Sequence, residues 1–90
     1  FVSVYDVINS IQNAISSDNN GVYNIASGKS VTIRELAELI ISTSGKKLEI
    51  KYTAPKKGDI VYSQADISLA KNKLGYYPKF ELKEGIRQIL

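Results

Sequence analysis

The fold is decided by the stretch VYNIASGKSVTIRELAELIISTSG, residues 22–45. It begins with a run of strand-forming residues, Val22–Ile25, which a Ser-Gly pair closes. Thr32 and Glu35 then form the T-x-x-E pattern of a capping box, and apolar residues recur at helical spacing as far as Gly45. The stretch therefore predicts a short strand followed by a helix, which ends where glycine suits a left-handed C-terminal cap.

The same alternation of strand and helix continues on both sides of this stretch. Phe1–Val4 is a short strand-prone run, and Leu48–Thr53 alternates apolar with polar residues at the period of a half-buried strand. Three further helices are expected. The first covers residues 7–15, the second is capped by Asp66 and ended by Gly75, and the third covers residues 82–90. We therefore expect an α/β fold of about three short strands and four helices. The sheet is expected to be incomplete, because three short strands cannot cover both sheet faces by themselves.

Composition and charge exclude several classes of function. The 90 residues are 43% hydrophobic and 23% charged, which is typical of a globular chain. The net charge of +3 comes from scattered lysines, which is weak support for a nucleic-acid partner. The chain has no cysteine and therefore no thiolate ligand. It also has no histidine, which is both the commonest metal ligand and the usual general base. No apolar run approaches the 18 or so residues of a membrane span. We expect a cytoplasmic protein without a metal site.

Several short signatures run along the chain in a fixed order. They are FVSVYDV at residues 1–7, VYNIASG at 22–28, PKKGD at 55–59, SQAD at 63–66 and LGYYP at 74–78. Each alone is a weak signal, but a collinear set that spans the chain is far more specific. Together they resemble the C-terminal part of the NAD-dependent epimerase/dehydratase family, the extended short-chain dehydrogenases/reductases, and within it most nearly the UDP-glucose 4-epimerases.

The resemblance implies that the redox chemistry of such an enzyme lies outside these residues. The family binds NAD through a G-x-x-G-x-x-G loop of a Rossmann domain, and no two glycines here are three residues apart. Its catalytic Y-x-x-x-K pair is matched literally by Tyr52 and Lys56, but Pro55 is incompatible with the helix that this spacing requires. Residues 1–90 are therefore expected to form a single C-terminal nucleotide-sugar-binding region, with no catalytic or cofactor-binding residue, while an N-terminal Rossmann domain absent from this chain binds NAD.

Four residues are candidates for substrate binding by this resemblance. Lys56 occupies a position where the family usually has an arginine that holds the diphosphate, and Lys57 can share this role. Asp59 is expected to accept hydrogen bonds from the ribose, and the hydroxyl of Ser63 can supply one hydrogen bond. The alternatives are a solvated pair of loop lysines and a turn-forming role for Asp59.

The resemblance thus implies the nucleotide-sugar-binding part of an NAD-dependent sugar-nucleotide epimerase, an isomerase whose ligand is a UDP-sugar or a related nucleotide sugar. A dehydratase of the same family is one alternative. A catalytically silent binding or assembly domain and a small basic nucleic-acid-binding module are the others. The full-length relatives commonly pair, so a homodimer is also expected.

Overall fold

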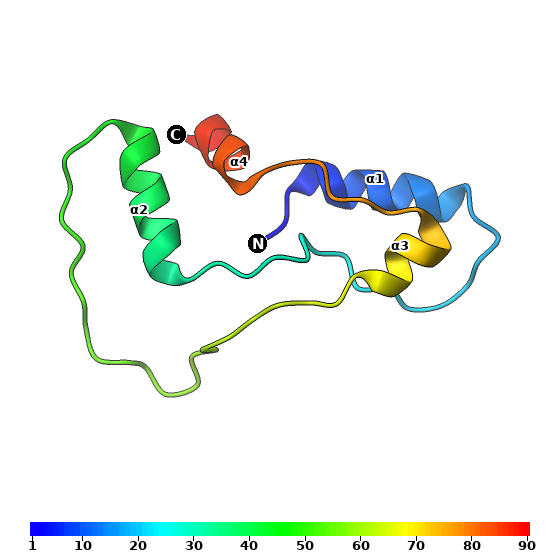
Figure 1. The fold of residues 1–90 in the computed structure, drawn as a ribbon, viewed down its shortest axis with the longest axis horizontal. Helices are drawn as coiled ribbons and strands as arrows, with labels where there is room; N and C mark the ends of the chain where they lie inside the picture. Colours follow the sequence, from blue (N-terminus) through cyan, green and yellow to red (C-terminus); the bar gives the residue numbers. More distant parts are fainter.

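The computed structural model describes residues 1–90 and consists of four α-helices joined by extended segments (Figure 1). The helices are α1 (Val4–Ile15), α2 (Ile33–Ser44), α3 (Ser68–Leu74) and α4 (Leu82–Ile89). They pack in two pairs, α1 with α3 and α2 with α4. None of the four has the length and apolar character needed to cross a lipid bilayer.

The overall shape is open. The radius of gyration is 16.1 Å, whereas a compact domain of this length would have a value of about 12 Å. Only 6 of the 90 residues are buried. The segment between α2 and α3 runs as a wide loop away from the helices (Figure 1). Most of the large apolar side chains are consequently exposed.

The predicted α/β fold is wrong for this chain, because the structure contains no strand and no sheet. A strand requires a second backbone to complete its ladder of hydrogen bonds. No backbone–backbone hydrogen bond involves Val22–Ile25 or Leu48–Thr53, so the alternation of side chains there has no ladder to support. The third predicted strand, Phe1–Val4, instead leads into α1, where the Ser3 side chain accepts a hydrogen bond from the Tyr5 N–H.

The local signals for helix ends are largely confirmed. Thr32 Oγ1 accepts from the Glu35 N–H at 3.0 Å, and a Glu35 carboxylate oxygen accepts from the Thr32 N–H at 2.9 Å, which completes the capping box of α2. Gly45 and Gly75 adopt left-handed conformations at the ends of α2 and α3. Asp66 acts slightly differently from expectation: α3 begins at Ser68, and Asp66 accepts from its N–H and hydroxyl.

The small core lies around α3. Ile67, Ala70 and Tyr76 are buried together, and the partly buried Tyr23, Ile25, Ala26 and Leu74 pack against them. The Tyr76 hydroxyl donates a 2.7 Å hydrogen bond to the Ala26 carbonyl. The segment that precedes α2 is thereby fixed to the segment that follows α3.

Asp6 fixes a second long-range junction, and its burial was not foreseen from the sequence. The residue is only 1% exposed. Its carboxylate accepts hydrogen bonds from the backbone N–H groups of Lys79, at 2.8 Å, and Phe80, at 3.2 Å. Asp6 therefore holds the connection between α3 and α4 against the first turn of α1.

Candidate functional site

The PKKGD signature forms a closed turn in the loop between α2 and α3. The Asp59 N–H donates to the Lys56 carbonyl at 3.2 Å, and the Asp59 carboxylate accepts from the Lys56 N–H at 3.2 Å. Gly58 has a φ of 91°, a backbone conformation that residues with a Cβ atom rarely adopt. The turn-forming role that the sequence allows for Asp59 is thus present, and it holds Lys56 and Asp59 together.

The turn presents positive charge to solvent. Lys56 and Lys57 are both exposed, and neither takes part in any of the three ion pairs of the structure. One oxygen of the Asp59 carboxylate forms the bond to Lys56, so the other stays available as an acceptor. Two free ammonium groups beside a carboxylate acceptor suit a ligand that carries phosphates and hydroxyls.

Ser63 is not brought into this arrangement. Its side chain is exposed and forms no hydrogen bond to the turn or to any other group. Ile60 and Val61, which lie between it and the turn, are also exposed. Of the four candidate residues, only Lys56, Lys57 and Asp59 share a single element of structure, the turn.

Gln64 connects the loop to the rest of the chain, a role that the sequence did not reveal. Its amide nitrogen donates to the Gly28 carbonyl at 2.9 Å, and its amide oxygen accepts from the Tyr62 hydroxyl. These contacts border a cleft of about 380 Å³, which Asp66, Ser68 and Lys71 also line. Gln64 belongs to the SQAD signature, but its hydrogen-bond partner lies 36 residues away. No local sequence pattern therefore indicates this bond.

Asp66, at one side of this cleft, is held in its charged form. Hydrogen bonds from the Ser68 hydroxyl and backbone N–H, with a smaller contribution from the charge of Lys71, lower the pKa of the Asp66 carboxyl below its ordinary value. The carboxylate is therefore an acceptor at neutral pH, already engaged by the start of α3.

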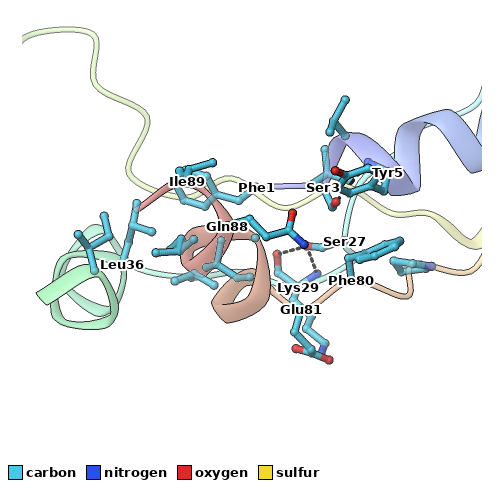
Figure 2. Close-up of a pocket in the computed structure, with 18 of the residues that line it drawn as sticks. Phe1, Ser3, Tyr5, Ser27, Lys29, Leu36, Phe80, Glu81, Gln88 and Ile89 are labelled. Atoms are coloured by element: carbon cyan, nitrogen blue, oxygen red, sulfur yellow. Dashed lines mark hydrogen bonds and ion pairs between the residues drawn. The ribbon is translucent and has the colours of Figure 1, made fainter. Parts of the chain in front are cut away.

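A larger cavity, of about 570 Å³, lies elsewhere, between α2, α4 and the N-terminal segment (Figure 2). Apolar side chains such as Phe1, Leu36 and Ile89 dominate its lining. Its one ion pair joins Lys29 to Glu81 at 3.6 Å, and both side chains are largely exposed. The lining of this cavity is mainly apolar, and it includes none of the candidate site residues.

Tyr52 and Lys56, the literal match to a catalytic pair, do not lie on a helix. Both belong to the extended segment between α2 and α3, and the Tyr52 side chain is 70% exposed. The helical spacing that would place the two side chains next to each other is therefore missing.

Comparison with known proteins identifies the relatives of this chain. No protein-family model matches it. A putative UDP-glucose 4-epimerase of Methanocaldococcus jannaschii is 33% identical over 90 residues, which are 100% of this chain and 29% of that protein. GDP-mannose 3,5-epimerase of Arabidopsis thaliana is 32% identical over 87 residues, 97% of this chain and 23% of that enzyme.

Solved structures agree with these sequence matches. UDP-glucose 4-epimerase of Thermotoga maritima, solved with UDP-glucose, has a TM-score of 0.88 and 37% identity over 96% of this chain and 28% of its own. The UDP-N-acetylglucosamine 4-epimerase of Methanobrevibacter ruminantium M1, in complex with UDP-N-acetylmuramic acid, has a TM-score of 0.89 and 35% identity over 98% and 28%. MoeE5, solved with UDP-glucuronic acid and NAD, has a TM-score of 0.84 and 27% identity over 96% and 29%.

The resemblance found in the sequence is thereby confirmed: the relatives and structural neighbours of this chain are UDP-glucose 4-epimerases and related NAD-dependent epimerase/dehydratases, and the chain matches a portion of each. UDP-glucose 4-epimerases are among both its sequence relatives and its structural neighbours. The chain spans less than a third of the length of each of these relatives.

Proposed function

We propose that residues 1–90 are the C-terminal, nucleotide-sugar-binding region of an NAD-dependent nucleotide-sugar epimerase of the UDP-glucose 4-epimerase type. The observation that carries the proposal is the turn of Lys56, Lys57 and Asp59, with two unpaired ammonium groups and a free carboxylate oxygen. This turn lies in a chain whose structural neighbours were solved with UDP-glucose and other UDP-sugars.

In this proposal the lysines neutralise the diphosphate of the ligand, and Asp59 accepts from the ribose hydroxyls. A lysine supplies a point charge, whereas the arginine that the family usually has at the position of Lys56 binds two oxygens through a planar fork. Lys57 adds a second point charge on the same turn. Ser63, four residues beyond the turn, would contribute one hydrogen bond if the bound ligand draws the loop inwards.

The chemistry of the enzyme belongs to the portion outside this chain. That portion is proposed to be an N-terminal Rossmann domain that binds NAD, which removes a hydride from the sugar and returns it. The region described here holds the nucleotide, so that binding energy away from the reacting carbon fixes the position of the sugar. A cytoplasmic homodimer that binds neither nucleic acid nor membrane completes the proposal, and the dispersed lysines of the chain support the exclusion of nucleic acid.

Turnover by the intact enzyme tests the proposed function. With NAD present, we expect the full-length protein to interconvert UDP-glucose and its C4 epimer without net consumption of NAD. Release of water with formation of a keto sugar would instead identify a dehydratase. Binding of neither UDP-glucose nor any other nucleotide sugar would contradict the proposal and leave a binding or assembly domain as the better interpretation.

A further inference from the structure

The helix α1 is oriented with its polar face inwards and its apolar face outwards. Asp6 and Ser10 are buried, and the Asn13 amide donates to the Gly75 carbonyl at 3.3 Å on the same side. The opposite face carries four aliphatic residues at helical spacing, Val4, Ile8, Ile11 and Ile15, whose exposed fractions are 63%, 46%, 55% and 80%. These four residues are called the α1 stripe below.

Hydrogen bonds hold the helix in this orientation. The Asp6 carboxylate accepts two backbone N–H groups, and Asn13 donates to a third backbone group. Asn19, just after the helix, donates to the Lys73 carbonyl at 2.8 Å. Rotating α1 to bury its stripe would break the bonds of Asp6 and Asn13, and it would leave the Lys79 and Phe80 N–H groups without their acceptor, which is costly.

The α1 stripe does not have the chemistry of a surface that faces water. The only charged side chain of α1 is Asp6, which is buried, so the exposed side of the helix carries no charge at all. Solvent-facing helix surfaces are normally lined with charged and polar residues. The absence of lysine and arginine also makes the stripe unsuited to an anionic membrane or a nucleic acid. The surface fits an apolar protein partner.

The size of the stripe favours a partner within the same polypeptide. A helix of 12 residues is about 18 Å long, so one face offers roughly 200 Å², far below the roughly 800 Å² that each partner of a stable complex buries. A surface in the same chain needs no such area, because docking does not cost the translational entropy of association. The solved relatives share this conformation at TM-scores of 0.88 and 0.89, and this chain accounts for only 28% of their length.

We propose that the α1 stripe is the surface on which this region packs against an apolar surface of the remaining, cofactor-binding portion of the same enzyme. The proposal rests on the proposed function in one respect only, namely that such a portion exists. It makes α1 a two-sided element, whose polar face organises residues 73–80 and whose apolar face joins the two parts of the enzyme.

Cysteine labelling of the full-length protein tests this proposal, because residues 1–90 contain no cysteine of their own. In a cysteine-free background, Ile11→Cys is compared with Lys83→Cys on the exposed side of α4. We expect a maleimide to label position 11 at least about tenfold more slowly than position 83 in the native protein, and equally fast in urea. Ile15→Cys serves as a second probe, and circular dichroism checks that each variant is folded.

Equal labelling rates at positions 11 and 83 in the native protein would overturn the proposal. Protection that disappears on dilution would also overturn it, because the stripe would then be covered by a second copy. A separate titration with UDP-glucose distinguishes this failure from a failure of the proposed function: protection of the stripe without UDP-glucose binding leaves the interface intact, and binding without protection removes the interface alone.

Discussion

The Asp6 carboxylate accepts a 2.8 Å hydrogen bond from the backbone N–H of Lys79, 73 residues further along the chain. The neighbouring N–H of Phe80 donates to the second carboxylate oxygen. A buried carboxylate that binds two backbone groups is a strong local constraint, because hydrogen bonds to charged acceptors are stronger than neutral ones. The family signature FVSVYDV thus contains a residue with a structural purpose.

Asp6→Ala should destabilise the intact protein by about 3 kcal/mol, because hydrogen bonds to charged groups contribute about 1.5–3 kcal/mol each and two backbone N–H groups lose their acceptor. Asp6→Asn keeps one acceptor oxygen and should lose less. Urea denaturation measures both. Asp18→Ala, at an exposed aspartate without a hydrogen bond, is the control and should change the free energy of unfolding by less than about 0.5 kcal/mol. Equal effects of Asp6→Ala and Asp18→Ala would refute this role.

Gly28→Ala should destabilise the protein more than Gly45→Ala. Both glycines have positive φ, 73° and 69°, so both substitutions strain the backbone by about 1 kcal/mol. At Gly28, however, the new Cβ would lie 3.0 Å from Ile67 Cδ1, whereas at Gly45 it would meet nothing within 4 Å.

The contribution of this contact can be isolated with a second substitution. Ile67→Val removes the Cδ1 atom, so the double variant Gly28→Ala/Ile67→Val should be more stable than the sum of the two single effects predicts. Thermal unfolding of the four proteins gives the coupling free energy. Strict additivity would mean that Ile67 does not limit the space at Gly28.

The free energy of unfolding should fall as pH rises above about 10. Burial, and secondarily the negative charge of Asp6, raise the pKa of the Tyr76 hydroxyl above its ordinary value of 10.0. The unfolded chain therefore loses this proton first, and stability that is present below pH 10 is lost as pH rises through the raised pKa. Urea denaturation between pH 8 and pH 11 should record a smaller fall for Tyr76→Phe than for the parent.

Tyr76→Phe also has an effect at neutral pH. It removes the hydrogen bond to the Ala26 carbonyl and should lower the free energy of unfolding by about 1–2 kcal/mol. Tyr77→Phe, at a neighbouring exposed tyrosine, provides the control. An unchanged alkaline fall in Tyr76→Phe would show that another group controls the pH dependence.

Lys56→Arg should strengthen the binding of UDP-glucose by a few-fold. A guanidinium group can donate two parallel hydrogen bonds to the diphosphate, where the ammonium group offers a point charge. Isothermal titration of the intact protein compares the two side chains at the same ionic strength. Weaker binding by the arginine variant would indicate that the lysine at this position is matched to a different geometry.

Sequence patterns predicted the parts of the fold that depend on neighbouring residues. The capping box of Thr32 and Glu35 and the glycine caps Gly45 and Gly75 are local interactions, and all three are present. The strands were wrong because a strand depends on a second backbone, which the alternation of side chains cannot supply. Leu48 and Tyr52 illustrate this: they alternate as a buried strand face would, yet both are exposed.

The same distinction applies to the candidate site. The turn from Lys56 to Asp59 contains four residues, so the PKKGD signature was enough to place both groups on one loop. Gln64 fixes that loop to Gly28, across 36 residues. Asp6 fixes the start of α1 to the segment between α3 and α4, across 73 residues. No local spacing encodes such partners. The ligand-binding roles of Lys56, Lys57, Asp59 and Ser63 stay predictions.

The most direct test of the central claim is the affinity of the intact enzyme for UDP-glucose after removal of one charge. Lys56→Ala should weaken binding about tenfold at low salt, because a charge-assisted contact to the diphosphate is lost. Lys46→Ala removes the same charge from another exposed lysine and should leave the affinity unchanged. Equal affinities of Lys56→Ala and the parent protein would contradict the assignment of this turn as the nucleotide-sugar site.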